Sequence, residues 1–195
     1  MENILQILKP KNKAEIDSAI QKKFQYSEPN EILHYALNHN NLYLVKYALA
    51  QGADPTHNHN WIIGWAANYS HTEIVELLLA DPRVDPSADS NYVIQLAADH
   101  GHTEVVKLLL ADPRVDPSAN DNFAIRRAAD HGYTEIVKLL LADSGVDPSA
   151  GDNTAIRWAA RNCHTEVVKL LLADSLVLQK LSRNQQIKYQ HMLNL

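Results

Sequence analysis

The sequence predicts an all-α solenoid, in which short pairs of helices stack one after another along the chain. Residues 71–101 and 102–132 are identical at 23 of 31 positions. Runs of the form [HY]-T-E-[IV]-V-[EK]-L-L-L-A-D recur every 31 residues and open at His71, His102, Tyr133 and His164. An asparagine has the same period, at Asn60, Asn91, Asn122 and Asn153. A fixed period of this length indicates repeated units that bury a shared core by stacking.

The first helix of each unit is predicted to follow the repeated Asn and to be short, about nine residues. Pairs such as Ser90-Asn91 and Asp121-Asn122 favour a helix N-terminus. The helix is expected to end near Gly101 in one unit, because glycine readily adopts the left-handed conformation of a helix C-cap. Ser70 and Cys163 occupy that glycine position in two other units.

The second helix, such as Thr103–Ala111, begins with a Glu near its positive end and is rich in Val and Leu. The stretch D-P-R-V-D-P-S that follows contains two prolines, which break any helix. Each unit is therefore expected to be a helix-turn-helix pair followed by a short loop.

Five repeats between two caps account for the chain. Residues 1–29 are expected to form a helical N-terminal cap, because Ile16, Ala19, Ile20 and Phe24 follow a helical period. Residues 184–195 are expected to form a half-repeat that caps the other end. The predicted repeats are 30–59, 60–90, 91–121, 122–152 and 153–183.

The composition is that of an ordinary folded protein rather than a disordered one, with 195 residues, 46% hydrophobic and 21% charged. The net charge is −5, and residues 30–175 hold 10 Lys and Arg against 19 Asp and Glu. This balance disfavours nucleic acid as a partner. A single cysteine, Cys163, favours an intracellular, cytoplasmic location. No apolar run approaches the length of about 20 residues that a membrane helix needs.

The pattern A-A-x-x-G-H-T-E-[IV]-V-K-L-L-L, followed by a turn and V-D-P, resembles the ankyrin repeat over residues 30–183. The period is 31, shorter than the family's usual value of about 33. The family's T-P-L-H tetrapeptide is replaced by Y-V-I-Q at 92–95. The resemblance implies a curved solenoid joined by short β-turn loops, with the first helices on the concave side. The loop D-P-R-V-D-P-S also resembles repeats of large DNA viruses, which implies the host cytoplasm as the location.

The turn of the first helix separates buried positions from outward ones. When positions are counted from the repeated Asn and each residue advances by about 100°, the Ile at +3 and the two Ala at +6 and +7 share one side. Positions +1, +5 and +8 lie on the opposite side. Large side chains recur at +5 and form what we call the first-helix ladder: Tyr35, Trp65, Leu96, Arg127, Trp158 and Tyr189. Aromatic residues and arginine dominate the energetically important positions of protein interfaces.

These outward positions are the candidate partner-binding residues, and they vary between repeats while the second helix is nearly invariant. The candidates are Tyr35, Trp61, Trp65, Tyr92, Leu96, Asp99, Phe123, Arg127, Asp130, Trp158 and Arg161. Two readings stay open for them, since the ladder side chains either contact a partner or pack on one another.

Other kinds of site have weaker support. The histidines that recur at one position lie in different repeats, about 10 Å or more apart, whereas zinc needs its ligands around one point. We therefore expect no metal and no cofactor, and a backbone bond for the repeated histidine. Arg126, Arg127, Arg157 and Arg161 form a basic group that nearby aspartates would neutralise. No glycine-rich phosphate loop or nucleophile motif is present, so we expect no catalysis.

The expected function is that of a monomeric module, neither enzymatic nor membrane-bound, that binds another protein through the concave face. The alternatives are an adaptor that recruits a target to other machinery and an array with a purely structural role.

Overall fold

The computed structural model describes residues 13–193, and the chain divides into two compact units, Met1–Asp54 and Pro55–Leu195. Within the described residues every regular element is a helix, as predicted. The predicted residues 1–12 of the N-terminal cap and the last two residues of the C-terminal cap lie outside this range.

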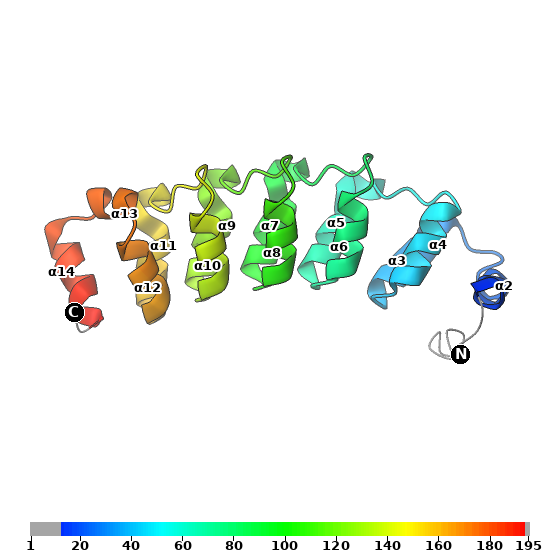
Figure 1. Ribbon diagram of the computed structural model, residues 1–195, viewed down its shortest axis with the longest axis horizontal. Helices are drawn as coiled ribbons and strands as arrows, with labels where there is room; N and C mark the ends of the chain where they lie inside the picture. Colours follow the sequence, from blue (N-terminus) through cyan, green and yellow to red (C-terminus); the bar gives the residue numbers. More distant parts are fainter. Residues whose placement is uncertain (1–12, 194–195) are drawn as a thin grey trace. The chain divides into compact units, whose positions relative to one another are not determined.

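The first unit contains α2 (Lys13–Lys23), α3 (Pro29–Asn38) and α4 (Leu42–Ala50) (Figure 1). The apolar side of α2 is turned inward, and Ile20 is buried. Two contacts join this helix to the pair that follows it. The Tyr43 hydroxyl donates a hydrogen bond to Asp17 at 2.8 Å, and the rings of Phe24 and Tyr35 meet edge to face at 5.4 Å.

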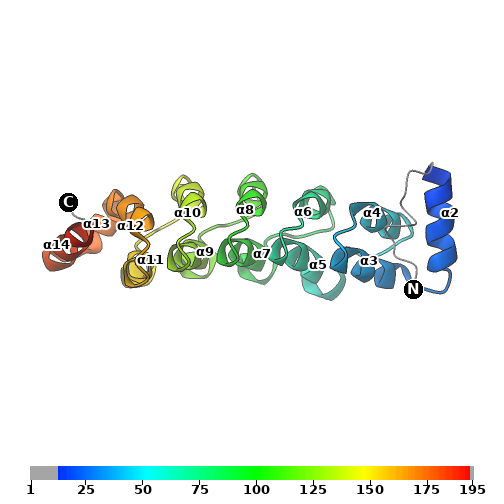
Figure 2. The same cartoon turned by 90° about the horizontal axis from the view of Figure 1, so that it is seen from below.

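The second unit contains four helix pairs and two further helices. The first helices of the pairs are α5 (His57–Asn68), α7 (Ala88–Asp99), α9 (Ala119–Asp130) and α11 (Ala150–Arg161). The second helices are α6 (Thr72–Leu79), α8 (Thr103–Leu110), α10 (Thr134–Leu141) and α12 (Thr165–Leu172). Seen along the helices, the first helices form one row and the second helices another (Figure 2). Each helix packs on its counterpart in the next pair.

The core lies between the two rows and has the composition that the periodicity predicted. In α5, Ile63 and the pair Ala66 and Ala67 are fully buried, and the corresponding residues of α7 and α9 are buried as well. The second helices contribute one buried three-residue pattern per repeat, such as Ile74, Val75 and Leu78. The small alanine side chains let the first helices approach closely.

The repeated asparagine has a different role from the predicted helix cap. Asp89, Ser90 and Asn91 all have positive φ angles, near 51–60°, so the right-handed part of α7 begins only after them. The Asn91 side-chain oxygen accepts a hydrogen bond from the backbone N–H of Asp116, in the loop that follows the second helix of the same repeat, at 2.8 Å. Asparagine suits both demands, because it tolerates the left-handed conformation and carries an acceptor.

The same bond recurs along the chain and joins the start of a repeat to the loop that follows its second helix. Within the first unit, the side chain of Asn30 accepts from the Asp54 N–H at 2.8 Å. In the second unit, Asn60 accepts from Asp85 at 3.1 Å and Asn122 from Asp147 at 2.8 Å. In the last repeat the Asn153 side-chain oxygen is buried and has no partner among the described residues. The invariant Asn of the sequence is therefore explained by a bond that joins the start of a repeat to its closing loop.

The loops between repeats are held by short-range aspartate bonds. The Asp112 carboxylate accepts from the backbone N–H and the guanidinium of Arg114, and Arg114 also donates to the backbone carbonyls of Leu79 and Val84 at 2.9 Å. The guanidinium beside it holds the pKa of Asp112 below its ordinary value. These bonds fix the D-P-R-V-D-P-S turn and attach it to the preceding repeat.

The C-terminal part contains one helix that was not predicted. After α12, a short helix α13 (Ser175–Lys180) precedes α14 (Arg183–Met192). The side chain of Asp174 caps α13 by accepting from the N–H groups of Leu176 and Val177, and a capping box between Ser182 and Gln185 begins α14. The repeat pattern did not predict α13, because the sequence of this helix has no counterpart in the other repeats.

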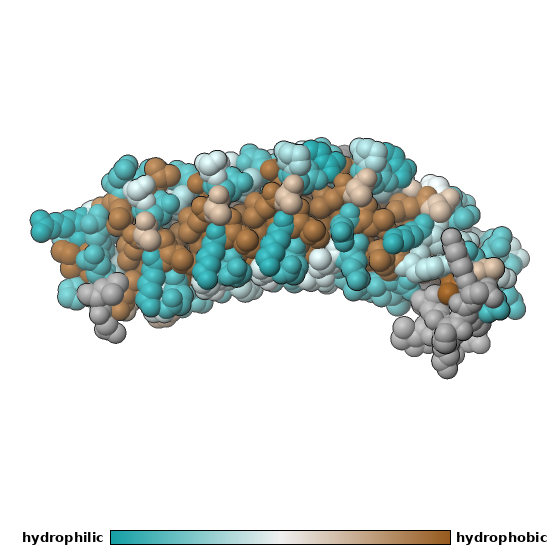
Figure 3. Space-filling model, in the orientation of Figure 1, coloured by the Kyte–Doolittle hydropathy of each residue, from teal (hydrophilic) through white to brown (hydrophobic). Residues whose placement is uncertain are grey.

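The two sides of the second unit differ in how much they vary. Three of the four second helices carry a Lys–Glu ion pair three residues apart, as between Lys107 and Glu104 at 2.7 Å and between Lys169 and Glu166 at 2.6 Å. The fourth, α6, has Glu76 at the position of the lysine. Figure 3 looks onto this side and shows similar polar stripes recurring between apolar surface. The first helices carry different outward side chains in each repeat. Most features that are specific to one repeat therefore lie on the first-helix side.

Candidate functional site

The candidate residues of the second unit lie along α5, α7, α9 and α11, and we call this surface the first-helix face. Tyr92 is 52% exposed, and Arg161 is exposed as well. The remaining candidates of this unit are half-buried: Trp61, Trp65, Leu96, Asp99, Phe123, Arg127, Asp130 and Trp158. Side chains in this state present part of their surface to solvent and part to the neighbouring helix.

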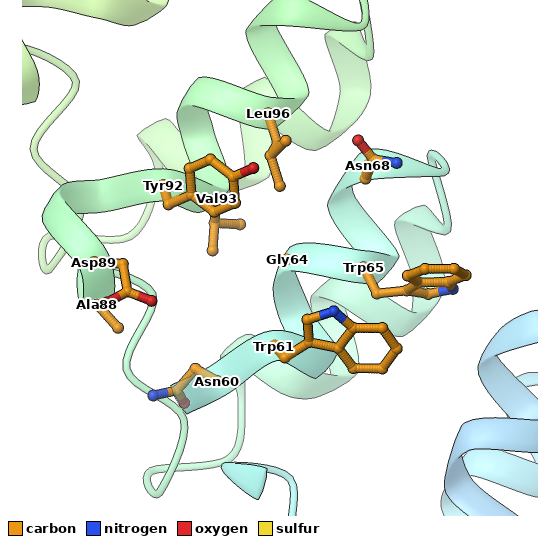
Figure 4. Close-up of a pocket in the computed structure, with 10 residues that line it drawn as sticks. All are labelled: Asn60, Trp61, Gly64, Trp65, Asn68, Ala88, Asp89, Tyr92, Val93 and Leu96. Carbon is orange, nitrogen blue, oxygen red and sulfur yellow. The ribbon is translucent and has the colours of Figure 1, made fainter. Parts of the chain in front are cut away.

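A hollow of about 330 Å³ opens between α5 and α7 on this face. Trp61 and Tyr92 lie on opposite sides of it, Gly64 lies between them, and Asp89 stands at one end (Figure 4). The other lining residues are Asn60, Trp65, Asn68, Ala88, Val93 and Leu96. The hollow therefore combines aromatic walls with a carboxylate.

Gly64 is the reason that the hollow exists. Its position holds Gln95, Arg126 and Arg157 in the other repeats of this unit, and all three have long side chains. A Cβ atom at Gly64 would lie 3.8 Å from the Leu96 side chain, which is an ordinary van der Waals contact. Glycine inside a helix destabilises it by about 0.5–1 kcal/mol relative to alanine. Neither packing nor backbone geometry requires a glycine here.

Aromatic rings follow one another along α5. The ring centroids of Trp61 and Trp65 are 4.9 Å apart, and those of Trp65 and Tyr69 are 4.5 Å apart. The ring of Trp65 points away from the hollow (Figure 4), and its indole nitrogen is buried with no hydrogen-bond partner among the described residues. Trp61 is thus the tryptophan whose ring faces the hollow.

Arg127 lies in a network of charged groups within the protein. Its Nε donates to Asp99 at 2.6 Å, and its Nη1 donates to Asp130 at 2.8 Å. His131 contacts both Arg127 and Asp99 at 3.1 Å. Asn162, from the following repeat, donates to the Asp130 carboxylate at 2.8 Å. This network joins α7, α9 and the end of α11, and it orients three of the candidate residues.

The predicted basic group is largely neutralised in the same way. Arg126 lies 3.8 Å from the carboxylate of Asp121, and Arg157 lies 3.4 Å from that of Asp152. Arg161 is exposed and forms no ion pair among the described residues. A concentrated positive patch is absent from this part of the first-helix face.

Two outward positions that the helical geometry assigned are buried instead. Tyr189, the last member of the ladder, is 5% exposed, because α14 packs its ring inward, and burial raises the pKa of its hydroxyl. Thr154, at position +1 of α11, is buried and donates its hydroxyl to the carbonyl of Gly151. Tyr35 belongs to the first unit, where its ring stacks on His39 at 4.0 Å.

The repeated histidine bonds to backbone, as expected. The Nε2 atom of His102 lies 2.8 Å from the carbonyl of Asn68, and that of His164 lies 3.0 Å from the carbonyl of Asp130. Each of these contacts reaches the preceding repeat. Within residues 13–193 no three His, Cys, Asp or Glu side chains gather in an arrangement that would hold a metal ion. In the same range no helix has both the length and the apolar character to span a bilayer.

Sequence reasoning missed Gly64, Asp89 and His131 as parts of this face. Gly64 and Asp89 both depart from the residue types of the sister repeats, so a search for departures in the repeat alignment would have found them. His131 has no such signal, because His100 precedes the corresponding glycine in another repeat.

Comparison with known proteins agrees with the repeat geometry. A family model described as ankyrin repeats (3 copies) matches residues 1–90, 63–152 and 94–184. The chain belongs to the ankyrin repeat family. Ankyrin repeats are generally protein–protein interaction modules and are typically non-catalytic.

A solved ankyrin repeat protein shares the fold. The crystal structure of EF0377, an ankyrin repeat protein, matches with a TM-score of 0.64 and 26% sequence identity. The match covers 86% of this chain and 95% of that chain. No curated protein matches the sequence of this chain.

Proposed function

We propose that the chain is a non-catalytic module that binds a partner protein through the first-helix face of residues 55–195, the face that is concave in the ankyrin family. The observation that carries the proposal is the hollow between α5 and α7, with Trp61 and Tyr92 on its two sides. Exposed aromatic side chains beside a hollow are the usual anchors of protein interfaces.

The pattern of variation supports the same face. The second helices repeat nearly one sequence, and three of the four carry the same ion pair, whereas the outward positions of the first helices hold Trp, Tyr, Phe and Thr at +1. Residues that only support the stack are free to be the same in every repeat. Differences concentrated on one face indicate that this face meets a non-repetitive surface.

The ion-pair network assigns a supporting role to part of the ladder. Since Arg127 already binds Asp99 and Asp130, its guanidinium is held in place before any partner arrives. We propose that these three residues keep the centre of the face rigid, which lowers the entropy lost on binding. Trp61, Tyr92 and Trp158 then supply the contact surface.

The other properties follow from the same observations. We propose that the chain is a monomer and that it acts inside the cell. The location follows from the single cysteine, which cannot form an internal disulfide. Nucleic acid is not the proposed partner, because the repeats carry an excess of acidic residues and the arginines of the face are paired with aspartates.

The test compares capture of proteins from a native extract by the wild type and two variants. The face variant carries Trp61→Ala and Tyr92→Ala, and the control carries Lys107→Ala and Lys138→Ala on the second helices. Circular dichroism verifies that all three are folded. A protein enriched by the wild type and the control, and lost by the face variant, supports the proposal. Equal capture by all three excludes the first-helix face, and the absence of any enriched protein contradicts a binding function.

A further inference from the structure

The hollow lies between α5 and α7. At the corresponding places in other repeats, the protein's own side chains fill the space. Between α7 and α9, Gln95 occupies the position of Gly64 and is 5% exposed. Its amide donates to the Ser90 carbonyl at 2.6 Å, and its oxygen accepts from the Asn120 side chain at 3.4 Å. Asn120 corresponds in the repeat to Asp89. The long side chain thus bridges α7 and α9.

Between α9 and α11 the same place is occupied by an arginine. The Arg126 guanidinium lies over the Phe123 ring, 5.7 Å from its centroid, and 3.8 Å from the Asp121 carboxylate. It donates to the Asn120 carbonyl at 3.2 Å, and a Cβ atom on Gly151 would lie 3.4 Å from its Nη1. The Arg126 side chain is only 18% exposed. A guanidinium is therefore accommodated at this position between an aromatic ring, a carboxylate and the start of α11.

Between α5 and α7 an aromatic ring and a carboxylate are present, and the long side chain is missing. Trp61 corresponds to Phe123. The carboxylate here is that of Asp89, which corresponds to Gly151, whereas the residue that corresponds to Asp121 is His59. Asp89 is exposed and forms no ion pair among the described residues. Gly64 removes the side chain that would otherwise fill the space.

We propose that this hollow binds an arginine side chain of the partner protein, which takes the place that Arg126 takes in its own repeat. The guanidinium stacks on the Trp61 ring and pairs with the Asp89 carboxylate, while its aliphatic part lies along Gly64, Val93 and Leu96. Cations favour the face of a tryptophan ring, and a planar guanidinium also stacks on it. This inference rests on the proposed function, since it names the chemistry of the bound partner.

The test uses nuclear magnetic resonance of the full chain, with N-acetyl-arginine amide as the probe. The neutral N-acetyl-citrulline amide, which has nearly the same shape, and N-acetyl-lysine amide serve as comparisons at constant ionic strength. The signals followed are the indole N–H of Trp61 and the backbone N–H of Tyr92. We expect saturable shifts with the arginine probe, and at least several-fold weaker binding of the other two.

Three variants locate the binding. Asp89→Asn is expected to weaken binding of the arginine probe at least threefold. Gly64→Gln, which restores the residue of the sister repeat, is expected to abolish its binding while the fold is kept. Glu73→Gln on α6 removes the same charge from the same repeat and is expected to leave binding unchanged.

Several outcomes would overturn the inference. One is the absence of a saturable shift in the wild type. Another is binding of the citrulline or lysine probe that equals binding of the arginine probe. A third is unchanged binding of the arginine probe by Asp89→Asn or Gly64→Gln. In one combination of results the arginine probe shows no binding, while the Trp61→Ala and Tyr92→Ala variant still fails to capture the protein that the wild type captures. In that case the arginine inference is wrong and the proposed function stands. If that variant captures the same proteins as the wild type, the proposed function itself falls.

Discussion

Replacing Asn91 with alanine should destabilise the second unit for two separable reasons. Asn91 is 8% exposed, and its side chain accepts the backbone N–H of Asp116 at 2.8 Å, a bond whose loss costs about 1 kcal/mol. Its φ angle is 60°, and an alanine held in this left-handed conformation costs a further amount of about 1–2 kcal/mol. The expected total loss is about 2–3 kcal/mol.

Asn91→Gly separates the two contributions, because glycine loses the bond but adopts the left-handed conformation freely. In an ordinary helix alanine is the more stable of the two by about 0.5–1 kcal/mol, and here the order should be reversed. Urea unfolding followed by circular dichroism measures the stabilities, and hydrogen exchange measures the loss of protection at the Asp116 amide in both variants. An alanine variant that is more stable than the glycine variant, or that keeps the protected Asp116 amide, would refute the reasoning.

Three further perturbations follow from the packing and the charges. Gly101→Ala should lower the melting temperature, with a loss of at least about 1–2 kcal/mol, because Gly101 has a φ of +78° and a Cβ there would lie 2.7 Å from the Tyr133 ring; an unchanged melting temperature contradicts this. Burial, together with the charge of His102, lowers the pKa of His71 from 6.5, so stability should fall as the pH drops below 6.5 and the unfolded chain takes up the proton first. His71→Tyr, the residue type of Tyr133, should reduce this fall in thermal melts between about pH 7.5 and 5.5, and an equal fall in both proteins excludes His71 as its source. The bond with Arg114 lowers the pKa of Asp112, so the contribution of this bond to folding stability is present above pH 3.8 and is lost as the pH falls further. Arg114→Met should therefore lower the urea midpoint more at neutral pH than at about pH 3, and equal losses at both pH values contradict the pairing.

Periodicity predicted the parts of the fold that repeat. The positions of Ile63, Ala66 and Ala67 follow from the helical turn, and all three are fully buried. The bond of Asn91 was not predicted, since its donor lies 25 residues away and the local sequence resembles a helix cap. The helix α13 was missed because its sequence is unique in the chain, and a repeat comparison carries no information about unique segments.

For the candidate site, the sequence indicated which helix face to inspect but not the shape of that face. The outward positions of Trp61 and Tyr92 follow from the helical turn. The hollow follows from the missing side chain of Gly64, and a search for chemically active side chains passes over a glycine. The engagement of Arg127 with Asp99 depends on side-chain directions in two neighbouring repeats, which the spacing within one repeat does not determine.

The bond between each repeated asparagine and the next loop has a consequence for how such a chain changes in length. A whole 31-residue copy brings one side-chain acceptor and one backbone donor, so inserting or deleting a copy leaves every other bond of the series intact. Gene duplication in register is therefore structurally tolerated, whereas a partial duplication leaves a donor or an acceptor without its counterpart. The near-identity of residues 71–101 and 102–132 fits a history in which whole copies were gained.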